Sequence, residues 1–173
     1  MAKLNLPATL LVLLLSSGAP LLAESNPIPN KAIDAEGFLQ TVQTAHLDRR
    51  SRRISEAEFL KMATDETTII LDARSANRFA QKHIVGAKNL PFTDFTEDAL
   101  KTVIPSKDTR ILIYCNNNIE NSLEAFPLKK PAASLNLSTF PALYSYGYEN
   151  VYELGPMIDP ATSKIQFQGS LVD

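Results

Sequence analysis

Apolar and polar positions along the chain follow two patterns, one typical of buried strands and one typical of helices. Four short apolar runs are bounded by polar or turn residues, and they lie at 67–71, 87–90, 110–114 and 151–154. Continuous apolar runs of this length are typical of strands buried on both faces of a sheet. Helical patterns at 75–81 and 94–103 separate them. This alternation predicts an α/β fold with an open, mainly parallel sheet flanked by helices on both faces.

Capping residues predict where two further helices begin. Asp34 can accept a hydrogen bond from the first turn of a helix that carries apolar side chains on one side. Ser55 and Glu58 stand at the spacing of a capping box, ahead of an apolar stretch that we expect to end near Thr64.

The stretch before the last apolar run predicts one more helix and an irregular segment. A helix is expected over 138–146, with Ser138 as its cap, Pro141 in its first turn and Gly147 ending it. Residues 126–137 contain two prolines and two adjacent lysines, so we interpret them as an insertion or a broken helix.

The N-terminus has the pattern of a secretory signal peptide. Lys3 precedes an apolar stretch at 10–15, and a cleavage site with small residues is expected near Ala23. Removal of residues 1–23 leaves 150 of the 173 residues, enough for one domain. We expect a periplasmic protein with no stable membrane insertion after cleavage, because polar residues and Pro20 interrupt the apolar stretch.

Charge and chain organisation narrow the classes of partner. The formal net charge is −2, so nucleic acid is not an expected partner. Four arginines cluster at 49–53, and we interpret them as a solvated linker. The expected organisation is a leader and N-terminal helix over 24–50, the main domain over 51–157 and a tail over 158–173.

Cys115 is the only cysteine, which cannot form an internal disulfide in an exported chain. It directly follows the run 110–114, as Asp72 follows the run 67–71. In open parallel sheets, ligands bind outside the carboxyl ends of the strands. We therefore expect a functional thiol presented at the surface; the alternative is a buried, inert thiol that ends a core strand.

A polar loop follows Cys115 and predicts a cradle for charged sulfur. Its members are Asn116, Asn117, Asn118, Ile119, Glu120 and Asn121. Asn121 and Glu124 are spaced to cap a following helix. Backbone N–H groups wrapped around the sulfur, together with the positive end of that helix, would stabilise a thiolate or a persulfide.

Four motifs in order resemble the rhodanese-like sulfurtransferase domain. They are Asp-Ala-Arg at 72–74, His-Ile-Val-Gly-Ala at 83–87, Ile-Tyr-Cys at 113–115 and Gly-Tyr-Glu-Asn-Val-Tyr-Glu-Leu at 147–154. Their order and spacing match the family over about residues 55–155. The resemblance implies the rhodanese-like fold and sulfane-sulfur transfer without a cofactor, as in periplasmic single-domain members with a divergent active loop.

The resemblance also implies roles for single residues. Cys115 would be the nucleophile that takes sulfur from thiosulfate or another small donor, holds it as a persulfide and passes it to a thiol or cyanide-type acceptor. We expect Asp72 and Arg74 to form a structural ion pair, and His83 to hold a turn by a hydrogen bond. No histidines or carboxylates stand at metal-ligand spacing, so no metal site is predicted.

The loop departs from the family pattern at two positions. Asn118 and Glu120 stand where many members have a glycine and a basic residue. An acidic side chain in the loop favours a second hypothesis, a non-catalytic binding or redox-sensing module that recognises a periplasmic protein. A phosphatase of the related cell-cycle type would need an arginine at the end of the loop, and Glu120 argues against that activity.

Overall fold

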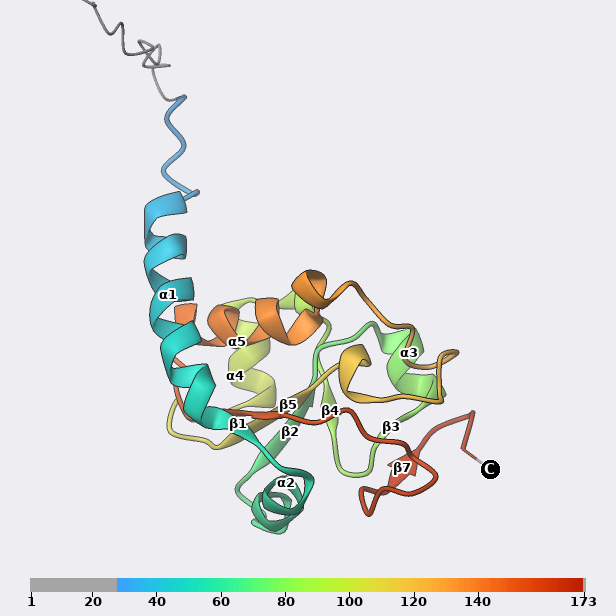
Figure 1. Cartoon of the computed structure of the whole chain (residues 1–173). Coiled ribbons are helices and arrows are strands. Elements are labelled where there is room, and N and C mark those ends of the chain that lie inside the picture. The colour runs from blue at the N-terminus through green and yellow to red at the C-terminus, as the bar shows by residue number, and fades with distance from the viewer. Residues whose placement is uncertain (1–27, 173) are drawn as a thin grey trace, which may run out of the picture. The chain divides into compact units, whose positions relative to one another are not determined.

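The structure is a computed structural model that describes residues 28–172 (Figure 1). The expected signal peptide, residues 1–23, lies outside the described residues. The chain divides into two units, 1–33 and 34–173, and the helices and strands described below belong to the second. Within residues 28–172, no helix is both long enough and apolar enough to cross a bilayer.

A five-stranded sheet with all its strands parallel forms the centre of the second unit, in the order β1-β6-β5-β2-β4. The central strands β2 and β5 pair along their full length, with Ile69 opposite Ile111 and Asp72 opposite Tyr114. The prediction of an open, mainly parallel sheet is therefore confirmed. In sheet order the strands are β1 (Arg53–Ile54), β6 (Val151–Leu154), β5 (Ile111–Tyr114), β2 (Ile69–Asp72) and β4 (Lys88–Asn89).

Helices cover both faces of this sheet (Figure 1). Helices α1, α4 and α5 pack on one face, and α2 packs on the other. The helices are α1 (Ala35–Arg52), α2 (Glu56–Ala63), α3 (Ala76–Gln81), α4 (Glu97–Val103) and α5 (Leu135–Ser145), and the short 3-10 turns are η1 (Phe92–Asp94), η2 (Asn116–Asn118) and η3 (Pro131–Ala133).

Two apolar clusters result from the alternation of side chains along the strands. Leu71 and Ile113 face the α5 side, whereas Ile70, Leu112 and Tyr114 face the α2 side. Each strand of the central pair is buried on both faces, because a strand with helices above and below it has no solvated side. This burial explains why these strands are apolar throughout.

The predicted helix starts at Asp34 and Ser55 are confirmed. The Asp34 side chain accepts a 2.9 Å hydrogen bond from Gly37 N–H at the start of α1. Ser55 and Glu58 form a complete capping box at the start of α2, which ends at Ala63 with Thr64 as its C-cap. Both caps satisfy backbone N–H groups that have no partner within the helix.

The N-cap of helix α5 lies four residues earlier than the sequence pattern predicts. Its N-cap position is Ser134, not Ser138, and Pro141 lies inside the helix instead of in its first turn. A proline in a helix interior removes a backbone hydrogen bond at a cost of about 3 kcal/mol. Burial of Phe140 and Leu143 against the sheet offsets that cost.

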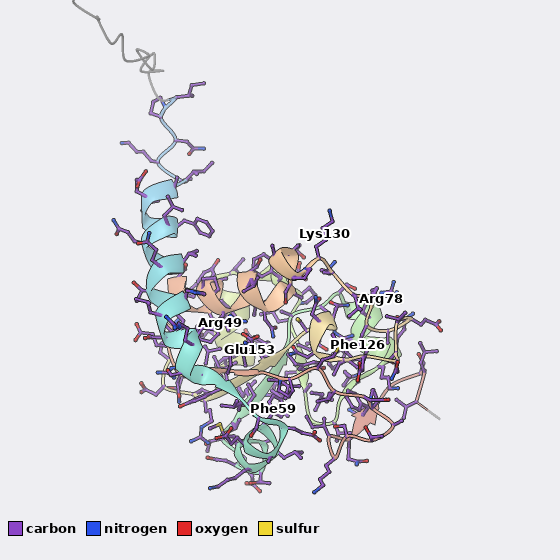
Figure 2. The ribbon with its side chains drawn as sticks, in the orientation of Figure 1. Arg49, Phe59, Arg78, Phe126, Lys130 and Glu153 are labelled. Atoms are coloured by element: carbon purple, nitrogen blue, oxygen red, sulfur yellow. The ribbon has the colours of Figure 1, made fainter. Side chains whose placement is uncertain are left out.

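The arginine cluster is not a linker, as the sequence had suggested. Helix α1 continues through Arg52 and leads directly into strand β1. The Arg49 guanidinium forms a two-point ion pair with Glu153 of β6, with Nε–Oε2 and Nη2–Oε1 distances of 2.5 and 2.7 Å (Figure 2). Glu153 needs this partner because it is buried among apolar strands.

The C-terminal segment contributes structure that the sequence pattern did not reveal. Ile158 forms a parallel bridge with Ile119, and Ile165 is buried in the cluster on the α2 side. A small antiparallel pair joins β3 (His83–Ile84) to β7 (Phe167–Gln168).

Gly147 provides a test of the turn between α5 and β6. Its φ is +76°, and a Cβ at this position would meet no atom within 4 Å. Gly147→Ala should lower the free energy of unfolding by about 1 kcal/mol through backbone strain alone. Gly147→Asn should cost less, because asparagine tolerates left-handed angles. Chemical denaturation of the three proteins measures the difference, and equal stability of the alanine variant would contradict this account.

Candidate active site

Cys115 lies at the carboxyl end of β5, where the chain leaves the sheet. It precedes the 3-10 turn η2 and has an extended backbone, with φ −147° and ψ −174°. Its exposed fraction is 0%. The expectation of a thiol presented at the surface is therefore wrong for this conformation, because the segment that leads into α5 covers the sulfur.

Two polar groups contact the sulfur. Cys115 Sγ lies 3.3 Å from the Ser134 hydroxyl oxygen, and it also accepts from the backbone N–H of Asn118. Ser134 occupies the N-cap position of α5, but its side chain does not cap its own helix. The N-terminus of an 11-residue helix carries partial positive charge, which favours negative charge nearby.

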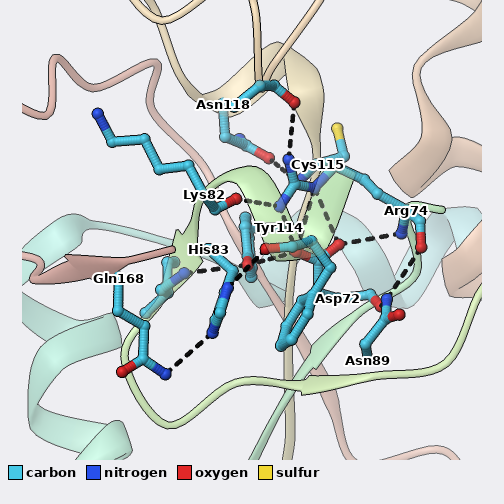
Figure 3. Close-up of polar contacts among 12 residues, drawn as sticks. Asp72, Arg74, Lys82, His83, Asn89, Tyr114, Cys115, Asn118 and Gln168 are labelled. Atoms are coloured by element: carbon cyan, nitrogen blue, oxygen red, sulfur yellow. Dashed lines mark hydrogen bonds and ion pairs between the residues drawn. The ribbon is translucent and has the colours of Figure 1, made fainter. Parts of the chain in front are cut away.

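The Asn118 side chain holds the loop that carries the thiol (Figure 3). Its oxygen accepts from Cys115 N–H at 2.9 Å and from the Asn136 amide at 3.1 Å. Its nitrogen donates to the carbonyls of Leu154 and Pro156 at 2.7 and 3.2 Å. A side-chain amide can make four hydrogen bonds, so Asn118 has no free group to offer a substrate anion.

The predicted ring of backbone amides around the sulfur does not form. The Asn118 N–H is shared between the Cys115 sulfur and the Cys115 carbonyl, and the N–H groups of residues 119 and 120 donate to the carbonyls of Asn116 and Ile158 instead. Ile119 is fully buried and pairs with Ile158, which draws the chain away from the sulfur. A single apolar side chain in the loop thus redirects it into the core.

The outer loop residues bind other segments. The Asn117 side chain donates to the Lys129 carbonyl at 2.8 Å and accepts from the Lys129 N–H at 3.2 Å. Asn121 adopts a positive φ of 53°, and its amide contacts Asp159 at 2.8 Å. Glu120 is exposed, and it borders neither of the two hollows described below.

The helix predicted to start at Asn121 is absent from its expected place. Residues 122–126 form a single turn, closed by a hydrogen bond from Phe126 N–H to the Ser122 carbonyl. The helix whose N-terminus approaches the sulfur is α5. Ser134 was missed by sequence reasoning, because its contact with Cys115 joins residues 19 positions apart and no local pattern marks it.

Asp72 and Arg74 form a buried ion pair at the end of β2 (Figure 3). The Arg74 guanidinium binds both Asp72 oxygens, and its remaining N–H groups donate to the carbonyls of Ala125 and Lys82 at 3.0 and 2.8 Å. It also lies 3.9 Å from the centre of the Phe126 ring. Through Arg74, the ion pair connects the end of β2 to the segments that contain Lys82 and Ala125.

Tyr114 completes this network on the face of the sheet opposite to Cys115. Its hydroxyl donates to Asp72 at 2.5 Å and accepts from Ile84 N–H at 3.1 Å. Burial, followed by the charge of Asp72, raises the pKa of the Tyr114 hydroxyl well above its usual value, so it stays a neutral donor. Successive strand residues point to opposite faces, which separates the ion pair from the sulfur.

His83 lies in the small sheet and holds its turn. Its Nδ1 lies 2.7 Å from the Phe79 carbonyl oxygen, and its Nε2 lies 2.9 Å from the side-chain nitrogen of Gln168. The ring stacks on Phe79 with 3.6 Å between centroids. Both ring nitrogens are engaged in these contacts.

Two hollows are lined by residues of the covering segment and by residues that follow the thiol in the loop. One, of about 230 Å³, is lined by Asn118 and Ser134, the two residues that touch the sulfur, and by Arg49 and Arg53. The other, of about 400 Å³, lies on the side of Asn116. In the latter, basic residues form part of the wall: Arg74, Arg78 and Lys129. The Arg78 side chain is labelled in Figure 2.

No group of three or more histidine, cysteine, aspartate or glutamate side chains within residues 28–172 is placed to hold a metal ion. The groups that meet at the described site are the sulfur of Cys115, the Ser134 hydroxyl, the Asn118 N–H and the N-terminus of α5.

Comparisons with known proteins identify the family. No curated protein matches this chain. Similar solved structures include the BH2092 protein from Bacillus halodurans, with 20% identity, 77% of this chain and 88% of that chain covered, and a TM-score of 0.49. The rhodanese-like domain of the Alr3790 protein from Anabaena sp. is 22% identical; the match covers 69% of this chain and 80% of that chain, with a TM-score of 0.48. EanB is 21% identical; the match covers 59% of this chain and 23% of that chain, with a TM-score of 0.44.

The family itself is shown by the sequence profile of the rhodanese-like domain, which matches residues 55–154, more than half of the 173-residue chain. The matched region runs from the capping box of α2 to the end of β6, and it contains both Cys115 and Ser134. The chain belongs to the rhodanese-like domain family.

Proposed function

We propose that this protein transfers sulfane sulfur and that Cys115 carries it as a persulfide. The observation that supports this function best is the 3.3 Å contact between Cys115 Sγ and the Ser134 hydroxyl at the N-terminus of α5. If the sulfur carries a negative charge, the Ser134 hydroxyl can donate to it, and the Asn118 N–H and the N-terminus of α5 would stabilise that charge further. An inert core thiol would be surrounded by apolar side chains instead.

The reaction proceeds by two displacements at sulfur. The Cys115 thiolate attacks the outer sulfur of a donor such as thiosulfate, the donor S–S bond breaks, and sulfite leaves with the bonding electron pair. A thiolate or cyanide acceptor then attacks the outer sulfur of the persulfide and releases the Cys115 thiolate. Each step makes one bond to sulfur and breaks one, so no external oxidant or cofactor is needed.

Access to the sulfur requires movement of a segment that we name the strap, residues 127–134. The strap ends at Ser134, and the double hydrogen bond between Asn117 and the backbone of Lys129 fastens it. Opening of the strap would join the sulfur to the adjacent hollows. Closure would keep a persulfide away from water and from other thiols.

A second candidate function is a non-catalytic binding or redox-sensing module. The observation that favours it is the full burial of Cys115, together with the absence of the expected amide ring. In this case the thiol would remain inside the domain and a periplasmic protein would be recognised by the outer surface. The two candidates differ in whether the sulfur ever leaves its cover.

Sulfur uptake tests the first proposal directly. After incubation with thiosulfate and removal of the excess, the intact mass of the protein should rise by one sulfur atom, and a reducing thiol should reverse the gain. Cys115→Ser should show no gain, because it lacks the nucleophile. Mass spectrometry of both proteins, with circular dichroism to confirm folding, makes the comparison.

Two outcomes would contradict sulfur transfer through Cys115. One is an equal gain in mass in Cys115→Ser. The other is a wild-type protein that alkylates at Cys115 but takes up no sulfur from thiosulfate or from an organic persulfide, which would favour the binding or sensing module.

Ser134 should act as a positioning residue for the sulfur. Ser134→Ala removes one hydrogen bond to an anionic sulfur, so the rate of persulfide formation should fall roughly tenfold, in line with about 1.5 kcal/mol. Ser138→Ala is the matched control, because Ser138 is exposed on the same helix. Stopped-flow measurement of thiosulfate consumption checks both variants, and equal rates in the two would remove Ser134 from the mechanism.

The strap should control access to the thiol. Asn117→Ala removes both hydrogen bonds to Lys129, so alkylation of Cys115 by iodoacetamide should become about tenfold faster. Lys129→Ala is the control, because Asn117 binds only the backbone of Lys129. Unchanged alkylation in Asn117→Ala would show that the thiol is exposed by some other motion.

A further inference from the structure

Helix α1 has an inner side that packs on the domain and an outer side whose side chains are exposed among the described residues 28–172. Of its 18 residues only Ala45 is buried. The inner side also carries Arg49, which binds Glu153, and Val42, which lines an apolar hollow against α5. These contacts fix which side of the helix points away from the sheet.

The outer side carries a regular series of residues. Along the helix they are Glu36, Leu39, Gln43, Leu47 and Arg50. At about 100° per residue, these five lie within an arc of about 80° whose centre is turned by about 160° from Ala45. Leu39 and Leu47 are 50% and 64% exposed. Within residues 28–172, no hydrogen bond or ion pair engages any of these five side chains.

This series is complementary to itself when it is reversed. From one end it reads acid, leucine, glutamine, leucine, base, with spacings of three, four, four and three residues. If two such helices pair antiparallel about Gln43, Glu36 faces Arg50 of the second copy, and Leu39 faces Leu47 of the second copy. A parallel pair would instead place like charges opposite each other.

We propose that the outer face of α1 is a docking surface for a second copy of this chain, in an antiparallel, two-fold symmetric helix pair. The two leucine layers supply the apolar burial, as at the seam of an antiparallel coiled coil. The charge pairs set the direction of the pairing, since exposed ion pairs add little affinity but like charges repel. In a two-fold pair the same patch serves both copies, so every contact occurs twice.

Charge-reversal variants test the register. In Glu36→Arg, two arginines face each other twice across the pair, and in Arg50→Glu two glutamates do so. Sedimentation velocity of the chain with its natural N-terminus should show a dimer for the wild type. Each variant alone should bind itself at least tenfold more weakly, because two attractive pairs become repulsive.

Mixing the two variants gives the decisive measurement. An equimolar mixture of Glu36→Arg and Arg50→Glu restores opposite charges at both positions, so heterodimers should form. Lys101→Glu, an exposed charge reversal on α4, should leave the wild-type dimer unchanged. A monomeric wild type at 100 µM (roughly ten times a weak-complex Kd of about 10 µM), or a mixture no more dimeric than its components, would overturn the proposal.

Cross-linking tests the geometry independently of the charges. Gln43→Cys places a thiol on the two-fold axis, so mild oxidation should join the two copies at residue 43. Thr44→Cys lies at the same level of the helix but is turned by about 100°, and it should cross-link much more slowly. Equal rates for the two variants would show random collision and would overturn the antiparallel pair.

Discussion

The side-chain amide of Asn118 is the contact on which the site depends. It accepts from Cys115 N–H and from Asn136, and it donates to the carbonyls of Leu154 and Pro156. These four bonds join the carboxyl ends of β5 and β6 to the first turn of α5. Because Asn118 is buried, each of its polar partners that was left without a hydrogen bond would lower the free energy of unfolding by about 1–3 kcal/mol. The position of the sulfur follows from this junction.

The two faces of the sheet contribute different parts of the site. On the α2 side, Asp72, Arg74 and Tyr114 form a closed network of buried charges and hydrogen bonds that joins loops from distant parts of the chain. On the α5 side, the sulfur of Cys115 meets a hydroxyl and a helix N-terminus. This network fixes the end of the central strands, and the sulfur of Cys115 lies on the other face, beneath the strap.

Helix α1 extends the family domain at its N-terminal side. The profile match begins at residue 55, after α1 and β1. Even so, Arg49 of α1 neutralises the buried Glu153 and forms part of the hollow beside Ser134. The same helix presents Leu39 and Leu47 to solvent on its opposite side. If the proposed antiparallel pair forms, this helix connects the hollow beside Ser134 to the interface between the two copies.

Local patterns in the sequence determined the strands β2, β4, β5 and β6, the caps at Asp34 and Ser55, and the placement of Cys115 at the end of β5, because these features depend on neighbours a few residues apart. The short strands β1, β3 and β7 were not predicted. The order of the family motifs determined the fold. Tertiary structure alone decided that Cys115 is covered, that Ile119 turns into the core and that Ser134 reaches the sulfur. Those outcomes depend on contacts between residues far apart in the chain, where burial of apolar side chains and pairing of buried polar groups select one loop path among many that the local sequence permits.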